Sequence, residues 1–387
     1  MRLDWLNPLV GRSGPFATVA LDATREAPES AHEIELRWEG HERRLRSLGA
    51  SPATIAAFED AAVAPTGRSG RTGRLLVAAD DTLVLDLTLP QPPVRELTTV
   101  GPIPQLMPAV RAFANCAPHL LVQVNRSGAD IDVVGILGEQ AARQQVEGDH
   151  DVMHKVPGGG WSQRRYQQRV EDSWERNAEE VAAEVDRLFR RYAPEIVLVA
   201  GDEHAMSALT GALVKPVLDK VVRIDSGGRA AGTSHEALNE AVESALARHV
   251  AERDGALVDA FAGARGRQRE AVQGLDSVVD ALRRAQVAQL LLHDDPTSDA
   301  TLWAGDKPLD LGLARADVTA LGVTTPVEVP ASAALVWALL GSGGGITLVD
   351  PAQVRLTGGI GALLRWTDGS TPHDGAPSMP GHGQSPG

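Results

Sequence analysis

The chain has 387 residues, a formal net charge of −14 at pH 7 and a single cysteine. At about 100–200 residues per domain, this length predicts two to four domains. One thiol cannot form an internal disulfide, so the fold does not depend on oxidation. The acidic balance argues against a general nucleic-acid coat protein, because phosphate contacts need lysine and arginine. The net charge does not exclude contact with RNA through local clusters of cations.

The apolar segments of the sequence argue against secretion and against insertion into a membrane. The first five residues carry Asp4 and lead into no apolar segment, so they are not typical of a signal peptide. The longest apolar run, residues 333–340, is far short of the roughly 20 residues that cross a bilayer. The sequence therefore predicts a cytoplasmic protein without a membrane partner.

Residues 1–115 are predicted to form an α+β domain. Their expected elements, in chain order, are a strand at 15–22, a helix at 29–48, a second helix that starts at Ser51-Pro52, and two strands at 75–79 and 83–89. Asp80-Asp81 separates the last two strands, which indicates a hairpin.

Residues 116–262 are predicted to form a middle α/β domain, and residues 263–366 a C-terminal α/β domain. The middle domain is expected to contain a hairpin at 119–124 and 131–136, a polar glycine-rich loop at 138–162, a helix at 168–192, and strands at 196–200 and 221–224. The C-terminal domain is expected to contain helices at 270–284 and 331–340 and strands at 287–293, 346–349 and 360–366. Alternating strands and helices predict parallel pairing. Residues 367–387 are rich in glycine, proline and serine, which predicts a disordered tail.

The most unusual segment is the glycine-rich stretch that enters the middle domain's long helix. Its candidate RNA-binding residues are Gly158, Gly159, Gly160, Trp161, Gln163, Arg164, Arg165, Tyr166 and Arg169. Glycines allow another molecule to approach the backbone closely, arginines bind phosphates, and aromatic rings stack on bases. The alternative is a plain loop whose arginines are solvated.

Two further arginine clusters contain no acid. Arg68, Arg71 and Arg74 alternate with glycines in residues 66–74, and Arg265, Arg267 and Arg269 lie in residues 263–269. Clustered arginines position a protein on phosphates without reading the base sequence. Chance composition of surface loops remains the alternative for both.

For the other polar residues, the sequence context favours structural roles. His150 and His154 have the spacing of zinc ligands on a helix, but no third ligand is evident. Asp202 follows a strand and is better read as a helix N-cap than as an acid–base group. Residues 341–345 are a glycine-rich turn that lacks the ending of a phosphate-binding loop. The sequence thus predicts no metal and no cofactor.

Three stretches, together with the order of the domains, carry a resemblance. They are Gly-Gly-Trp-Ser-Gln-Arg-Arg-Tyr at 159–166, Val-Leu-Val-Ala-Gly-Asp at 197–202 and Gly-Gly-Ile-Gly-Ala-Leu-Leu-Arg at 358–365. The chain resembles the bacterial branch of the archaeal and eukaryotic class-I release factor and Pelota superfamily, and is most similar there to Balon-type ribosome hibernation factors. The resemblance extends over about residues 1–366. It implies a three-domain architecture with mixed-sheet α/β middle and C-terminal domains.

The resemblance also implies partners. Members of this superfamily bind the ribosomal A site, and Balon-type members are delivered with elongation factor Tu. Residues 66–74 are then candidates for contact with 16S rRNA at the decoding centre, and residues 158–169 for contact with 23S rRNA near the peptidyl-transferase centre. Neither DNA nor a membrane is implied.

One departure separates this chain from release factors. Those proteins carry a Gly-Gly-Gln motif, whereas here Trp161 and Ser162 separate Gly160 from Gln163. The favoured hypothesis is therefore a non-catalytic factor that occupies a vacant A site and keeps ribosomes inactive. The alternatives are a peptidyl-tRNA or tRNA hydrolase that acts through Gln163, and an α/β protein with an unrelated ligand.

Overall fold

The computed structural model of the chain describes residues 1–26, 30–68, 70–125, 127–147, 161–224, 235–266 and 270–368, with side chains from Glu175 onward in the fourth helix. Contacts divide the chain into two compact units, residues 1–114 with 254–387 and residues 115–253. The second boundary falls inside one long helix. Mixed α/β structure is present in both units, as predicted.

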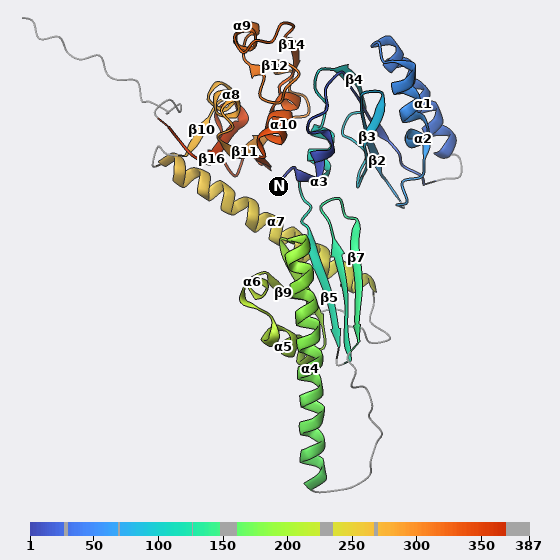
Figure 1. Ribbon diagram of the computed structural model, residues 1–387, viewed down its shortest axis with the longest axis vertical. Coiled ribbons are helices and arrows are strands. Elements are labelled where there is room, and N and C mark those ends of the chain that lie inside the picture. Colours follow the sequence, from blue (N-terminus) through green and yellow to red (C-terminus); the bar gives the residue numbers. More distant parts are fainter. Residues whose placement is uncertain are drawn as a thin grey trace, which may run out of the picture. The chain divides into compact units, whose positions relative to one another are not determined.

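The N-terminal part of the first unit is a four-stranded antiparallel sheet with two helices on one face (Figure 1). Its elements are β1 (Phe16–Asp22), α1 (Ser30–Ser47), α2 (Pro52–Val63), β2 (Gly73–Ala79), β3 (Thr82–Leu89) and β4 (Leu97–Gly101), preceded by the short η1 (Asp4–Leu9) and followed by α3 (Met107–Phe113). The strand order is β3-β2-β1-β4, so β3 and β4 are the edges. The core contains Trp38 of α1 and Phe58 of α2, whose rings meet edge to face at 6.4 Å. The predicted strands, helices and hairpin of this part are confirmed.

Local chemistry explains why these elements begin and end where they do. Ser51 is the N-cap of α2, and its hydroxyl oxygen accepts a hydrogen bond from the Thr54 N–H at 3.0 Å. Asp80 and Asp81 have φ values of +51° and +57°, as a two-residue hairpin turn requires. The Thr54 hydroxyl donates to the Asp81 carboxylate at 2.6 Å, which fixes the hairpin to the start of α2.

The C-terminal part of the first unit contains two sheets. The larger has the order β10-β16-β11-β15, from β10 (Ala271–Gln273), β16 (Ile360–Leu364), β11 (Val287–His293) and β15 (Gly345–Val349). The smaller has the order β13-β12-β14, from β12 (Thr301–Ala304), β13 (Leu311–Gly312) and β14 (Val327–Pro330). The helices are α8 (Leu275–Arg283), α9 (Arg315–Ala320), α10 (Ala331–Ser342) and the short η2 (Thr357–Gly359). The predicted helix at 270–284 begins later than expected, because residues 271–273 pair with β16.

Several contacts join these two parts of the first unit. Trp337 of α10 is 2% exposed, and its ring meets Phe16 of β1 edge to face at 5.3 Å. Arg111 of α3 donates to the Asp294 carboxylate at 2.7 Å. Ile346 of β15 donates its backbone N–H to the Met1 carbonyl at 2.9 Å. The predicted first and third domains therefore pack as one unit, and the three-domain boundaries stay a prediction.

The second unit is a five-stranded mixed sheet with the order β7-β6-β5-β8-β9. Its strands are β5 (His119–Asn125), β6 (Gly128–Val134), β7 (Gln140–Glu147), β8 (Ile196–Gly201) and β9 (Val221–Ile224), and its helices are α4 (Trp161–Tyr192), α5 (Glu203–Ala212), α6 (Lys215–Leu218) and α7 (His235–Gly266). Strands β5, β8 and β9 are parallel, which confirms the predicted pairing. Strand β7 lies where a loop was predicted and pairs antiparallel with β6.

Helices cover the two faces of this sheet. Helices α4 and α5 pack on one face through a core that includes Val185, Val199 and Leu209. The N-terminal half of α7 packs on the other face through Leu238 and Ala245. Both faces are covered, so the central strands read as continuous apolar runs.

Candidate functional site

Helix α4 is anchored to the sheet through its C-terminal half. Val181, Val185 and Leu188 recur at helical spacing and are no more than 1% exposed in the core below the helix. On the outer face, Arg187 donates to both oxygens of the Glu184 carboxylate, at 2.8 and 2.6 Å. These contacts hold the helix axis in a fixed direction relative to the sheet of the same unit.

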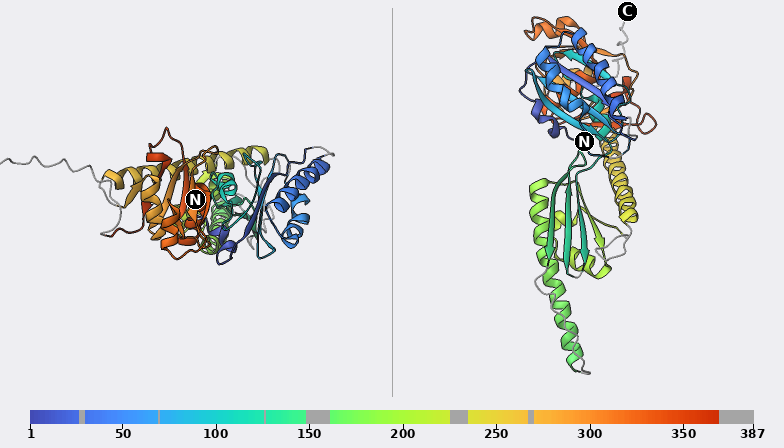
Figure 2. Two further views of the ribbon diagram at one scale, coloured as in Figure 1. Left: turned by 90° about the horizontal axis from the view of Figure 1, so that it is seen from above. Right: turned by 90° about the vertical axis from the view of Figure 1, so that its right-hand side faces the viewer.

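The N-terminal half of α4 extends beyond the sheet (Figure 1). The right-hand view of Figure 2 shows the same extension from a second direction. Among the helix residues whose side chains are described, Glu175 onward, the first buried one is Asn177. Trp161 lies 16 positions before it, which at 1.5 Å per residue places the start of the helix about 24 Å along the axis from Asn177. An anchored helix thus carries its first turns away from its own domain.

The extended turns contain most of the residues predicted to bind RNA. The backbone at Trp161, Gln163, Arg164, Arg165, Tyr166 and Arg169 is helical, and the helix starts seven residues earlier than predicted. Arg165 and Arg169 are four positions apart, so they occupy one helix face. No acid precedes Glu171 in the helix. The side chains of these residues, and Gly158, Gly159 and Gly160 entirely, lie outside the described part of the chain, as do His150 and His154.

The backbone at Gln163 is helical, two positions after the first residue of α4. At 1.5 Å per residue, these two positions correspond to about 3 Å along the helix axis.

The arginines of residues 66–74 separate into two kinds. Arg68 and Arg71 are exposed in the loop that leads into β2. Arg74 is 6% exposed, and its guanidinium donates to both oxygens of Asp86 on β3, at 2.7 and 2.8 Å, and to the Ala64 carbonyl at 2.8 Å. The prediction that Arg74 binds RNA is therefore wrong. Its charge is used inside the first sheet, and a phosphate cannot reach it.

The third arginine cluster is only partly described. Arg265 is exposed near the C-terminal end of α7, beside a groove lined by Phe261 and Val354. Arg267 and Arg269 lie outside the described residues.

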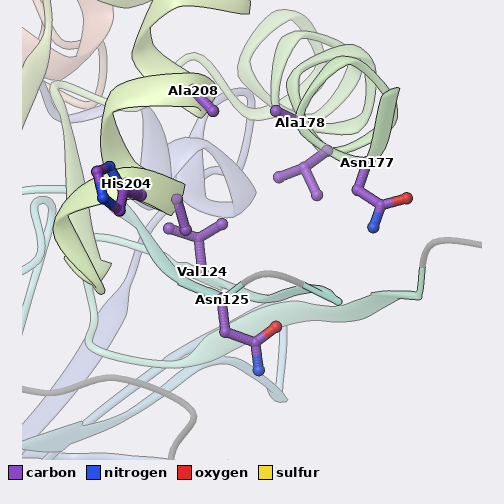
Figure 3. A pocket seen from close by; sticks show the side chains of 8 residues that line it. Val124, Asn125, Asn177, Ala178, His204 and Ala208 are labelled. Carbon is purple, nitrogen blue, oxygen red and sulfur yellow. The ribbon is translucent and has the colours of Figure 1, made fainter. Parts of the chain in front are cut away.

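A small pocket lies at the carboxyl ends of β5 and β8, where an α/β sheet often binds a ligand. Asn125 of β5, Asn177 of α4 and His204 of α5 line it, together with small apolar side chains (Figure 3). Its volume is about 20 Å³, which suffices for a water molecule but not for a nucleotide or an amino acid. Asp202 beside it accepts a hydrogen bond from the Ala205 N–H at 2.9 Å, which confirms its prediction as the N-cap of α5.

No cluster of three or more histidine, cysteine or carboxylate side chains among the described residues has the arrangement of a metal site. No described helix combines the length and the apolar character needed to span a bilayer.

Comparison with known protein families identifies the segment that contains α4. Residues 118–267 match the family model of bacterial archaeo-eukaryotic release factor family 2. This segment is similar to the bacterial archaeo-eukaryotic release factors, and it includes the whole five-stranded sheet, α4 and α7.

Full-length similarity to individual proteins is lower. The uncharacterized protein Rv2629 of Mycobacterium tuberculosis (strain H37Rv) is 24% identical to this chain over 368 residues, which are 95% of this chain and 97% of the relative. The solved structure of an archaeal translation termination factor, aRF1, is 15% identical with a TM-score of 0.24, and covers 94% of this chain and 96% of its own. A ribosome-bound archaeal Pelota is 16% identical with a TM-score of 0.35, and covers 94% of both chains.

Proposed function

We propose that this protein is a ribosome-binding translation factor that occupies the vacant A site and keeps the ribosome inactive. The observation that carries the proposal is the extension of α4. A helix anchored in a release factor-like domain carries Arg164, Arg165 and Arg169 about 12–20 Å along its axis from Asn177, the first buried side chain among its described residues. Cations near the end of a long helix suit contact with the phosphates of a large RNA surface.

A second RNA contact comes from the first unit. Arg68 and Arg71 are exposed in a glycine-containing loop, and Gly67 and Gly70 hold φ values of +71° and +81° that favour glycine. We assign this loop to 16S rRNA at the decoding centre and the start of α4 to 23S rRNA near the peptidyl-transferase centre. Delivery by elongation factor Tu is part of the proposal, because the resemblance to Balon-type factors implies it.

The proposed factor is not a hydrolase. The sequence supports this view, since Trp161 and Ser162 separate Gln163 from Gly160 and shift the glutamine along the chain by more than catalytic geometry tolerates. The alternative, hydrolysis of peptidyl-tRNA through Gln163, predicts release of labelled peptide from a stalled ribosome. Such release, lost in Gln163→Ala, would replace the non-catalytic proposal.

The experiment is co-sedimentation of the purified protein with 70S ribosomes in two states. Ribosomes with an empty A site should carry the protein into the pellet, and ribosomes whose A site holds a tRNA should not. Translation of a reporter messenger RNA should fall in proportion to the bound fraction. Equal binding to both ribosome states, or no binding to either, would contradict the proposed site.

A further inference from the structure

A groove of about 460 Å³ lies between helix α1 and strand β4 in the first unit. Leu36, Gly40 and Arg44 line it from α1, four positions apart along the helix, and Leu97 and Thr98 line it from β4. No residue of the proposed RNA contacts belongs to it. The groove therefore needs a separate explanation.

Strand β4 has one unused edge. It pairs only with β1 and ends the sheet β3-β2-β1-β4, so its other edge faces no strand among the described residues. Its five residues, Leu97–Gly101, are all half-buried and include no lysine, arginine, proline or acid. Natural edge strands usually carry such residues to prevent pairing with another chain. An edge without them is able to accept an added strand.

Gly40 keeps the groove open. It lies in the middle of α1, where glycine stabilises a helix less than alanine does. A Cβ atom at this position would meet nothing within 4 Å, so packing inside the chain does not require glycine here. The missing side chain instead leaves room for the backbone of another molecule to approach α1 beside β4.

The groove attracts negative charge. Arg44 is exposed and has no ion-pair partner among the described residues, whereas Arg37 already lies 3.9 Å from the Asp22 carboxylate and 3.8 Å from the Glu33 carboxylate. The acid in the groove, Glu96, already accepts a hydrogen bond from the Asp22 N–H at 2.9 Å and lies 3.6 Å from His41. The hydrogen bond with His41 is the main cause that holds the pKa of Glu96 below its ordinary value. A visiting carboxylate would therefore find an unsatisfied guanidinium at Arg44.

An apolar contact is available beside these charges. Leu36 is 50% exposed on the rim of the groove, next to Leu97. A strand alternates its side chains between two faces, so an added strand can direct acids to Arg44 on the face toward α1 and apolar groups to Leu97 on the other face, since the neighbouring Thr98 faces α1 through its contact with His41. An RNA strand would meet the arginines but would leave the backbone groups of the β4 edge unpaired.

We propose that the α1–β4 groove binds an extended, acidic segment of a partner protein, which pairs with β4 as an additional strand. The site is independent of ribosome binding through α4. Main-chain hydrogen bonds to β4 supply affinity, and Arg44 and Leu97 select acids and apolar side chains in alternation.

The test uses the full-length protein and a fluorescein-labelled eight-residue peptide of alternating glutamate and valine, followed by fluorescence anisotropy at physiological salt. The expected result is saturable binding that Arg44→Glu and Gly40→Leu each weaken at least tenfold. Gly40→Leu fills the groove with a strong helix former, so the variant should fold as well as the parent. Arg43→Glu is the matched control, because Arg43 is exposed on the same helix but donates to the Glu39 carbonyl outside the groove.

Further arms separate the possible occupants. A peptide of alternating lysine and valine should bind at least tenfold more weakly, and amide exchange at Leu97–Gly101 should slow only with the acidic peptide. The proposal is overturned if Gly40→Leu or Arg44→Glu leaves peptide binding unchanged, or if an eight-nucleotide uridine RNA competes for the groove. It is also overturned if sedimentation shows a dimer that Gly40→Leu dissociates, since the occupant would then be a second copy of this chain.

Discussion

Replacing Trp337 with alanine should unfold both parts of the first unit together. Its indole is 2% exposed and packs edge to face on Phe16 of β1, while the rest of α10 is buried nearly all round. A buried aromatic of this size removes about 150–250 Å² from water, worth about 4–6 kcal/mol at 25 cal/mol per Å². Truncation of buried tryptophan costs about 3–5 kcal/mol in measured series, because the cavity partly relaxes.

The assay is urea unfolding followed by far-ultraviolet circular dichroism, with Trp366→Ala as the control. Trp366 is 46% exposed, so its removal should change the free energy of unfolding by less than about 0.5 kcal/mol. A double-mutant cycle of Trp337 with Phe16 should return a coupling of about 0.5–1.5 kcal/mol. A loss below about 1 kcal/mol in Trp337→Ala, or no coupling to Phe16, would refute the view that the first and third predicted domains pack as one unit.

Three further outcomes are expected. Arg74→Ala should lower the free energy of unfolding by about 1–3 kcal/mol in a denaturant titration, because it removes the guanidinium's hydrogen bonds to the solvent-accessible Asp86 carboxylate and to the Ala64 carbonyl, whereas Arg71→Ala should change it little. Ser51→Ala should cost about 1 kcal/mol by the same titration, because α2 loses its N-cap. The lowered pKa of Glu96 contributes stability that is present above its ordinary value of 4.5 and is lost as the pH falls through the folded-state pKa. His41→Gln should therefore flatten the acid side of a melting-temperature profile, and an unchanged profile would contradict the hydrogen bond's role.

Local signals in the sequence predicted much of the fold. The apolar spacing of Ile34, Trp38 and Leu45 marked α1, and the Ser51-Pro52 pair marked the start of α2. Strand β7 escaped prediction because it is a polar edge strand, exposed on most positions, and owes its shape to pairing with β6 rather than to alternation. The strands β12, β13 and β14 have two to four residues each, which is too short for a periodic signal.

In the candidate sites, the local sequence could not predict which charged side chains pair with each other in the fold. Arg74 stands among glycines and arginines, and nothing local distinguishes it from Arg71. Its partner Asp86 becomes its neighbour only when β2 and β3 pair, with Arg74 opposite Thr88 two positions away. The cations of the α1–β4 groove also went unnoticed, because Arg37 and Arg44 join Glu96 only through the packing of α1 on β4. Arg37, His41 and Arg44 are four and three positions apart, so they share one face of a helix, and this spacing is the sequence signal that could have predicted the cluster.

The salt dependence of ribosome binding tests the central claim most directly. Each arginine that contacts a phosphate adds about 1 to the slope of the logarithm of the association constant against the logarithm of the salt concentration. We expect Arg164→Gln with Arg165→Gln to reduce that slope by about 2 on empty-A-site ribosomes. The matched pair Arg190→Gln with Arg191→Gln, in the last turn of the same helix, should leave it unchanged. Equal slopes in the parent protein and both double variants would contradict the claim that the extended start of α4 lies against ribosomal RNA.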